Sequence, residues 1–261
     1  MNFSEKVVLV TGASSGIGEA VSVLLAELGA RLILVARKPE NLHRVAKKCH
    51  QSLGKVPLVV TADVTNENDV IRIEQEVTNN FGRLDILLNI VGGIIPETIL
   101  EPNVEKFDRN IILNLRSVYI MISRFQPHLS KTKGNIVNVT SIVSDIIIRG
   151  HCGYNVSKAG VEYITKYAAA ELADKGVRVN CVKPGVTRTP VLEKMGFSKE
   201  ESDKMYDDME KKMPLGKIIE PREVAHAVVF LASDLAKNVT GTIFTIDGGQ
   251  ILAGPSRIEL K

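Results

Sequence analysis

The sequence predicts an α/β protein with a doubly wound, three-layer fold around a seven-stranded parallel sheet. Short β-branched runs alternate strictly with longer amphipathic stretches, a pattern typical of parallel strands joined by crossover helices. Nearly every strand run is continuously apolar, so helices should cover both faces of the sheet. With 261 residues, 44% of them hydrophobic, the chain can bury one large core, and we expect a single domain over residues 1–261.

The expected strands and helices occupy well-separated stretches. The seven strand runs are 7–10, 32–35, 58–61, 86–89, 136–139, 177–182 and 243–246. Helical patterns cover 16–29, 40–53, 67–81, 104–129, 154–175 and 221–233. A charge-dense stretch, Ser198 to Lys212, follows the loop that starts at Pro184. This stretch predicts a helical insertion at about 187–215.

The composition argues against several classes of function. The net charge is only +3, Trp is absent and aromatic residues make up 5% of the chain, so nothing indicates nucleic-acid binding. Cys49, Cys152 and Cys181 lie far apart without a Cys-x-x-Cys pair, which predicts neither disulfides nor a metal site. No apolar run approaches the roughly 18 residues of a membrane span, and the start lacks a signal-peptide pattern. We therefore expect a soluble, cytoplasmic protein.

Three glycines mark the turn between the first strand and the first helix. The segment Thr11-Gly12-Ala13-Ser14-Ser15-Gly16-Ile17-Gly18 has the spacing Gly-x-x-x-Gly-x-Gly. Glycine allows a tight turn and lets the backbone approach a pyrophosphate, which then lies at the positive end of the helix. In this context the segment predicts a dinucleotide site on a Rossmann-type fold, although glycines that serve only the turn produce the same pattern.

The end of the second strand bears on the choice of dinucleotide. An acidic residue there would accept a hydrogen bond from a free ribose 2′-hydroxyl, but the chain reads Val35-Ala36-Arg37-Lys38. Arg37 offers charge-assisted hydrogen bonds to a 2′-phosphate. This favours NADP(H) over NAD(H); the alternative is that Arg37 and Lys38 only end a strand in solvent.

A tyrosine and a lysine four residues apart form the candidate acid/base pair. Tyr154 and Lys158 share one face of the predicted helix. A free tyrosine titrates near 10, and a neighbouring ammonium should lower the pKa of Tyr154 so that it exchanges protons at neutral pH. Because a surface pair with this spacing also arises by chance, other polar groups must converge on it.

Two such groups come from other predicted elements. Ser141 follows the fifth strand at its carboxyl end, the edge of an open α/β sheet where ligands bind. Asn114 lies in an apolar helical pattern, where an amide is costly unless it is hydrogen-bonded. Asn114 is therefore either part of the site or a satisfied core residue.

The glycine spacing, Ser141, Tyr154 and Lys158 together resemble the short-chain dehydrogenase/reductase family. The resemblance runs from about Lys6 to Gly249. Further matching motifs are Asp63-Val64, Asn114 in the fourth helix, Pro184-Gly185 and Ile246-Asp247-Gly248-Gly249. The resemblance implies an oxidoreductase that interconverts a carbonyl and an alcohol, in which Tyr154 donates the proton, Ser141 binds the carbonyl oxygen, Lys158 binds the nicotinamide ribose and Asn114 holds a relay water.

The resemblance also implies a cofactor site. It comprises Gly12, Ser14, Ser15, Gly16, Ile17, Gly18, Arg37, Asp63, Val64, Asn89, Gly92, Tyr154, Lys158, Pro184, Gly185, Val186, Thr187 and Thr189. Asp63 and Val64 would contact adenine, and the segment 186–189 would approach the carboxamide. Two departures affect local contacts: Asn89-Ile90-Val91-Gly92 stands where the family has Asn-Asn-Ala-Gly, and Thr187 replaces a common aliphatic residue.

The residues around the expected site favour a hydrophobic carbonyl substrate such as a steroid, isoprenoid, retinoid or xenobiotic. The apolar residues are Ile94, Ile95, Ile142, Val143, Ile146, Ile147 and Ile148, which could instead belong to the core or to a subunit contact. A 3-oxoacyl thioester reductase and a non-catalytic NADP(H)-binding regulator are the alternatives.

The resemblance further implies a homotetramer, with a homodimer left open, in which helices 104–129 and 154–175 form one interface.

Overall fold

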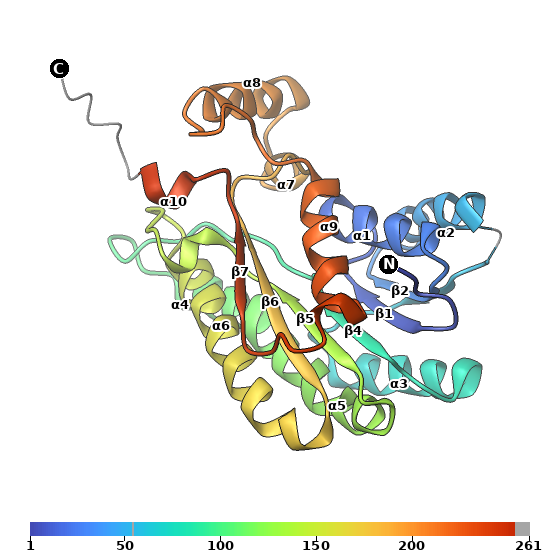
Figure 1. Ribbon diagram of the computed structural model, residues 1–261. Coiled ribbons are helices and arrows are strands. Elements are labelled where there is room, and N and C mark those ends of the chain that lie inside the picture. The colour runs from blue at the N-terminus through green and yellow to red at the C-terminus, as the bar shows by residue number, and fades with distance from the viewer. Residues whose placement is uncertain (54, 254–261) are drawn as a thin grey trace.

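The computed structural model describes residues 1–53 and 55–253, and one parallel sheet forms its centre (Figure 1). The strands are β1 (Val7–Thr11), β2 (Arg31–Ala36), β3 (Leu58–Thr61), β4 (Ile86–Asn89), β5 (Asn135–Val139), β6 (Arg178–Pro184) and β7 (Ile243–Ile246). Their order in the sheet is β3-β2-β1-β4-β5-β6-β7. The predicted seven-stranded parallel sheet of the doubly wound, Rossmann-type fold is confirmed, and all seven predicted strands are present.

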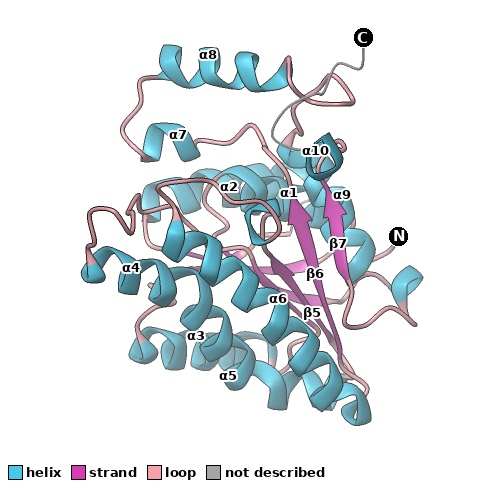
Figure 2. Cartoon of the chain, turned by 90° about the vertical axis from the view of Figure 1, so that its left-hand side faces the viewer, coloured by secondary structure: helices cyan, strands magenta, loops and turns pink. Residues whose placement is uncertain are grey.

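Helices cover both faces of this sheet (Figures 1 and 2). The first layer contains α1 (Gly16–Glu27), α2 (Pro39–Leu53) and α9 (Pro221–Ala232). The other contains α3 (Glu67–Phe81), α4 (Val104–Ile111), α5 (Ser117–Thr132) and α6 (Cys152–Leu172). Three further helices, α7 (Val191–Lys194), α8 (Lys199–Glu210) and α10 (Gln250–Ala253), follow β6 and β7. Among the described helices, none is long and apolar enough to cross a membrane.

The continuous apolar runs of the strands explain the three layers. Successive side chains of a strand point to opposite faces, so an unbroken apolar run supplies both. In β1, Val8 and Val10 join the core under α1, α2 and α9, whereas Val7 and Leu9 join the core under α3, α5 and α6. The sequence of the central strands therefore requires that helices cover both faces of the sheet.

Local signals set several helix ends. Asn66 caps α3 by accepting a hydrogen bond from Asn68 N at 2.9 Å, and the helix ends at Gly82 with φ of 65°. Within the stretch expected to form a helical insertion, the structure has α7 and α8, which lie beyond the carboxyl ends of β6 and β7 (Figures 1 and 2). α8 begins with a capping box between Ser198 and Glu201.

The predicted helix over 104–129 differs from the observed structure in one respect. A five-residue π-helical turn, Ile112–Arg116, separates α4 from α5, and the helix continues to Thr132. The turn is centred on Asn114, whose side chain is fully buried. Hydropathy periodicity over so few residues does not distinguish a π turn from an α-helical one.

Replacing Phe125 in α5 should destabilise the fold. Phe125 is 0% exposed in the core beneath α3, α5 and α6, and Phe125→Ala should lower the free energy of unfolding by about 3 kcal/mol because it leaves a cavity. Chemical denaturation measures this value. Ile71→Ala, which truncates an exposed residue of α3, is the control, and equal losses in the two variants would contradict the assigned core.

Candidate active site

The candidate site lies where the strand order reverses. β1 has β2 on one side and β4 on the other, and the connections from β1 and β4 leave toward opposite faces of the sheet. Such a point leaves a crevice outside the carboxyl ends of the strands. The glycine-rich turn follows β1, and Ser141 and the Pro184-Gly185 pair lie at the carboxyl ends of β5 and β6. The fold therefore brings to one sheet edge segments that are far apart in the sequence.

The glycine-rich turn is too tight for side chains at two of its positions. Gly12 has φ of +69°, and a Cβ there would lie 2.9 Å from the backbone nitrogen of Val91. A Cβ on Gly18 would lie 2.1 Å from the carbonyl oxygen of Gly12. The bare backbone of this turn thus faces the loop after β4 and forms a cradle that can receive a phosphate group.

The charge at the start of α1 is compatible with an anion. Glu19 in the first turn would repel a phosphate, but it pairs with Arg44 at 2.6 Å and Lys48 at 2.8 Å. The hydrogen bond from Arg44 lowers the pKa of Glu19 against the effect of burial, and Lys48 adds to the lowering. Because α2 supplies both cations, the positive end of α1 keeps its attraction for anions.

Other residues predicted for the cofactor lie around this turn. At the end of β4, Asn89 is buried and donates to Asn138 Oδ1 at 2.9 Å, while its own Oδ1 has no hydrogen-bond partner among the described residues. Arg37 is 68% exposed after β2 and lies 3.8 Å from Asp63. Asp63 also accepts from Thr65 N at 3.0 Å, and Val64 is buried beside it. This arrangement fits a nicotinamide dinucleotide, with Arg37 free to reorient because its ion pair is long and exposed.

The segment after β6 closes the other side of the turn. Thr189 lies against Gly16, since a Cβ on Gly16 would be 3.1 Å from the Thr189 methyl group. Gly185 packs against Asp247, and Val186 N donates to Gln250 Oε1 at 3.1 Å. Thr187 Oγ1 donates to the carbonyl oxygen of Gly185 at 3.0 Å, so the hydroxyl that departs from the family pattern is satisfied locally.

Tyr154 and Lys158 lie one turn apart on α6, as the spacing predicts. Lys158 is 4% exposed, its Nζ donates to the carbonyl oxygen of Val139 at 3.0 Å, and the same atom lies 5.7 Å from the centre of the Tyr154 ring. A Cβ on Gly92 would lie 3.3 Å from Lys158 Nζ and 3.1 Å from Asn114 Oδ1. The missing side chain of Gly92 is what allows these two polar groups to approach the loop after β4.

The expected lowering of the Tyr154 pKa is wrong for this structure. Burial raises the pKa of Tyr154 to about 12, and a hydrogen bond with the Ser141 side chain opposes that rise only in part. Lys158 contributes nothing to the pKa of Tyr154 here, and its ammonium donates to the carbonyl oxygen of Val139. Burial also lowers the pKa of Lys158 to about 8. The same dry surroundings therefore favour the neutral form of both side chains.

Ser141 occupies the place that the sequence predicts. It precedes a short 3-10 turn, Ile142–Ser144, has extended backbone and accepts from Val143 N at 3.4 Å. Its side chain lies near the Tyr154 hydroxyl and acts to lower the pKa of that group. Ser141 and Tyr154 thus offer two adjacent hydroxyl groups, which is the pairing that would bind one oxygen atom of a ligand.

Asn114 is hydrogen-bonded entirely within the protein. Its Oδ1 accepts from Gly93 N at 3.0 Å and its Nδ2 donates to Gly93 O at 3.0 Å and to Asn110 O at 3.1 Å. The amide therefore pairs with both backbone groups of one residue, as a neighbouring strand would. The side chain holds the loop after β4 in place.

Sequence reasoning missed two residues that support this arrangement. Asn110, fully buried, pairs with both backbone groups of Ile95 at 3.2 and 2.8 Å and donates to Glu97 at 3.0 Å. Glu97 is 8% exposed, and its other oxygen accepts from Gly153 N in the first turn of α6. The available signals were an acid within the apolar segment around Ile95 and a second asparagine one helical turn before Asn114.

A third missed feature is the buried ion cluster around Lys183. This lysine is 5% exposed on β6, and its Nζ lies 2.6 Å from Asp145 and 3.0 Å from Glu162. Burial acts to lower the pKa of Lys183, but hydrogen bonds to the two carboxylates outweigh it and raise the pKa. The cluster ties β6, the turn after Ser141 and α6 together behind the site.

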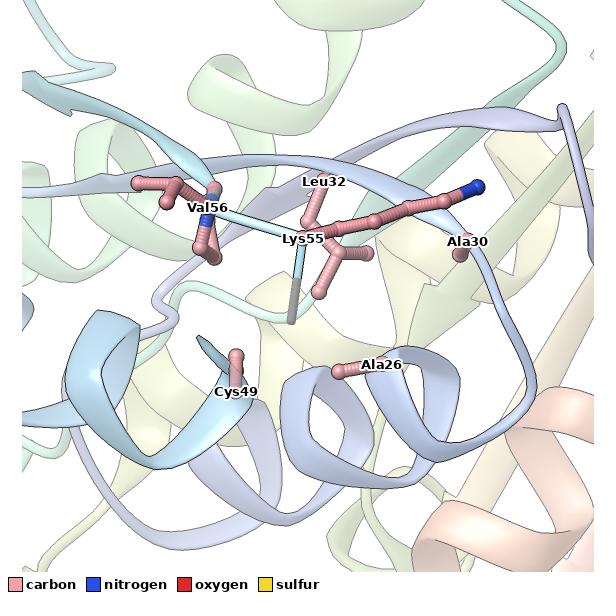
Figure 3. Close-up of a pocket in the computed structure, with 7 residues that line it drawn as sticks. Ala26, Ala30, Leu32, Cys49, Lys55 and Val56 are labelled. Atoms are coloured by element: carbon pink, nitrogen blue, oxygen red, sulfur yellow. The ribbon is translucent and has the colours of Figure 1, made fainter. Parts of the chain in front are cut away.

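Other parts of the described chain offer less chemistry. A small hollow lies at the opposite, amino end of the sheet, beside the start of β2 (Figure 3). It is lined by Ala26, Ala30, Leu32, Cys49, Lys55, Val56 and Pro57. Lys55 there bonds to the carbonyl oxygen of Gly29 at 3.2 Å. No group of three metal-ligating side chains occurs among the described residues.

Comparison with known proteins agrees with the fold. A family model described as enoyl-(acyl carrier protein) reductase matches residues 12–250, and the chain belongs to the short-chain dehydrogenase/reductase family, whose members are oxidoreductases acting on alcohols and carbonyls. A 3-oxoacyl-acyl-carrier-protein reductase from Thermotoga maritima is 36% identical, covering 97% of this chain and 100% of the relative.

Two solved structures show the same architecture. A short-chain dehydrogenase/reductase of unknown function from Caenorhabditis elegans, solved with cofactor, has a TM-score of 0.92 at 33% identity over 96% of each chain. The L-sorbose reductase of Gluconobacter frateurii, solved with NADPH and L-sorbose, has a TM-score of 0.89 at 30% identity over 96% of this chain and 98% of that one. Members of the family bind a nicotinamide cofactor, which the cradle at the glycine-rich turn fits.

Removing the Glu97 carboxylate should loosen the start of α6. Glu97→Ala leaves the backbone N–H of Gly153 buried without its acceptor, and we expect a loss of about 1–3 kcal/mol in the free energy of unfolding. Urea denaturation measures the loss. Glu101→Ala, an exposed acid four residues further on, should cost little, and similar values for both variants would show that Glu97 does not hold the helix.

The buried Lys158 should make stability depend on pH. Its pKa falls from 10.5 to about 8 on folding, so between these values the unfolded chain binds more protons than the folded one and stability rises with pH. Below about pH 8 the buried ammonium costs stability. From pH 8 to 10.5, the unfolding free energy of the wild type should therefore rise relative to that of Lys158→Met. A constant difference across this range would contradict the lowered pKa.

Proposed function

We propose that the protein is an NADP(H)-dependent oxidoreductase that interconverts a hydrophobic carbonyl compound and its alcohol, with Tyr154 as general acid/base. The observation that carries the proposal is the meeting of four groups at the carboxyl edge of the sheet: Ser141, Tyr154, Lys158 and Asn114. Two adjacent hydroxyls, a buried ammonium and an amide-held loop lie beside the glycine-rich turn. These are the parts that acid/base catalysis on a carbonyl requires.

In the direction of reduction, a nicotinamide held at the glycine-rich turn would supply the hydride chemistry, and Tyr154 supplies the proton. A pKa of about 12 keeps the Tyr154 hydroxyl protonated at neutral pH, the state that a proton donor needs. Ser141 positions the carbonyl oxygen against this hydroxyl. The buried ammonium of Lys158, one helical turn from Tyr154, would bind the nicotinamide ribose.

The supporting residues have indirect roles in this proposal. Asn114 fixes Gly93 of the loop after β4 from both backbone groups, and this loop forms one wall of the crevice. Glu97 holds the first turn of α6 at Gly153, directly before Tyr154. We assign both as positioning residues, since neither is placed to exchange a proton with the substrate.

The NADP(H) preference rests on Arg37. The end of β2 carries no carboxylate, and the guanidinium of Arg37 is exposed there. A guanidinium recognises a phosphate through paired hydrogen bonds, whereas a free ribose would favour an acid at this position. That a structural neighbour was solved with NADPH is compatible with this preference.

The apolar substrate class rests on exposed side chains near the start of α6. Glu97 N donates to Gly150 O at 3.0 Å and so pairs the loop after β4 with the segment before α6. Exposed apolar residues on these two segments are Ile99, Leu100, Ile147 and Ile148. Ile142 and Val143 are instead buried in the structure. A gathering of exposed apolar side chains on paired segments favours an apolar ligand.

A second candidate substrate is a 3-oxoacyl thioester. The 36% identity to a reductase named for that substrate favours it. A non-catalytic cofactor-binding regulator is disfavoured because the acid/base set is complete.

We further propose a homotetramer or homodimer, in which exposed Tyr119 of α5 and Tyr163 and Tyr167 of α6 form part of a subunit interface.

Substituting Tyr154 should separate chemistry from binding. Tyr154→Phe removes only the hydroxyl, so turnover should fall at least about a hundredfold while the Kd for NADPH stays near the wild-type value. Fluorescence titration with NADPH and NADH gives the affinities, and NADPH absorbance reports turnover on apolar ketones, polar ketones and a 3-oxoacyl thioester. Full turnover in the variant would contradict the role of Tyr154, and turnover of polar ketones alone would overturn the apolar class.

A further inference from the structure

We propose that Lys194, on the short helix α7 of the inserted segment, binds the 2′-phosphate of the cofactor and thereby closes that segment over the adenosine end of the site. This inference rests on the proposed NADP(H) preference and adds a residue that lies far along the chain from Arg37. α7 and α8 stand beyond the carboxyl ends of the strands (Figures 1 and 2). The inserted segment would therefore take part in holding the cofactor.

The first argument is the contact between Lys194 and the glycine-rich turn. Lys194 Nζ donates to Ser15 Oγ at 2.8 Å. Ser15 is the N-cap residue of α1, yet its side chain makes no capping hydrogen bond to the helix. The hydroxyl thus bonds to the ammonium of the inserted segment, and a cation from α7 lies beside the amino end of α1.

The second argument is that the connection to α7 packs on the same turn. A Cβ on Gly16 would lie 3.1 Å from the Thr189 methyl group and 3.9 Å from Pro190 Cδ. Tyr206 of α8 donates to Thr189 O at 2.8 Å and accepts from Thr189 N at 3.3 Å. α8, the loop before α7 and the glycine-rich turn are therefore linked by direct contacts, and Lys194 is placed by more than its own hydrogen bond.

The third argument is the charge around Lys194. Burial lowers the pKa of Lys194, and repulsion from Arg37 and Lys38 lowers it further, while Glu193 opposes in small part. Among the described residues, no carboxylate lies within ion-pair distance of Lys194, and the carboxylate nearest Arg37 is 3.8 Å away. Three cations from two distant parts of the chain thus lie close enough to repel one another, and only the long ion pair of Arg37 with Asp63 offsets their charge. A doubly charged phosphate would relieve this repulsion.

The neighbours of Lys194 favour the 2′-phosphate over the pyrophosphate. Arg37 and Lys38 directly follow β2, the strand whose carboxyl end meets the adenosine ribose in this fold. A pyrophosphate would instead lie along the backbone N–H groups of the turn, which serve NADH and NADPH equally. A contact to the 2′-phosphate therefore discriminates between the two cofactors, whereas one to the pyrophosphate does not.

The test compares Lys194→Gln with Lys199→Gln, which removes the same charge from an exposed lysine at the start of α8. Calorimetric titrations of the full-length protein use NADPH, NADH, 2′,5′-ADP and 5′-ADP. Lys194→Gln should weaken NADPH and 2′,5′-ADP about tenfold, the size of one charge-assisted hydrogen bond at a partly exposed site. NADH and 5′-ADP should bind within about twofold of wild type, and Lys199→Gln should change none of the four.

A second readout follows the inserted segment itself. In wild type, 2′,5′-ADP should slow proteolytic cleavage within 191–210 and 5′-ADP should not, and Lys194→Gln should abolish the difference. Unchanged NADPH affinity in Lys194→Gln overturns the inference, and equal weakening of NADH and NADPH assigns the ammonium to the pyrophosphate and overturns it too. If wild type binds NADPH no tighter than NADH, the proposed cofactor preference fails first and the role of Lys194 fails with it.

Discussion

The loop after β4 depends on two buried asparagines, and much of the site depends on that loop. Asn114 pairs with both backbone groups of Gly93, and Asn110 does the same for Ile95. A loop that runs across a sheet edge has backbone polar groups that no neighbouring strand satisfies, and leaving them buried and unpaired would cost more than the hydrogen bonds gain. The helix that follows supplies the missing partners. Glu97 extends this network to the first turn of α6.

Burial sets the electrostatics of the site in two opposite ways. At Tyr154 and Lys158 it disfavours the charged forms, so an unliganded tyrosine stays protonated beside a lysine that loses its proton more easily than usual. At Lys183 two carboxylates compensate for burial and the ammonium is retained. Lys158 on α6 is thus available to respond to a ligand, whereas Lys183 fixes β6 against α6.

Much of the fold could be predicted because its signals are local. Continuous apolar runs identified all seven strands, and their alternation with amphipathic stretches predicted that the sheet is parallel. The π turn at Asn114 was not predictable in this way, and the hydrogen bond that Asn114 makes with Gly93 is a tertiary contact that periodicity does not report. Motif residues of the candidate site could be named from the sequence because spacing and position within the fold place them. Glu97, Asn110 and Lys183 carry no such spacing, and their roles arise only from contacts between distant segments.

The direction of the Tyr154 pKa shift is another property that the sequence alone does not predict. Spacing correctly puts Lys158 one helical turn from Tyr154, but it cannot say how dry the surroundings are or that Val139 takes the ammonium as its hydrogen-bond partner. The sign of a pKa shift depends on the balance of burial and charge. That balance exists only once β5 and α6 are packed together.

The π turn also makes the length of the helical segment 104–132 a constraint in its own right. Each residue of an α-helix turns the chain by about 100°. A π turn acts as one extra residue, so it rotates all following side chains about the helix axis. Deleting a single residue from Ile112–Arg116 would restore a regular helix and rotate Met121, Phe125 and Leu129 out of the core. This helix should therefore tolerate substitutions on its surface far better than any change in its length.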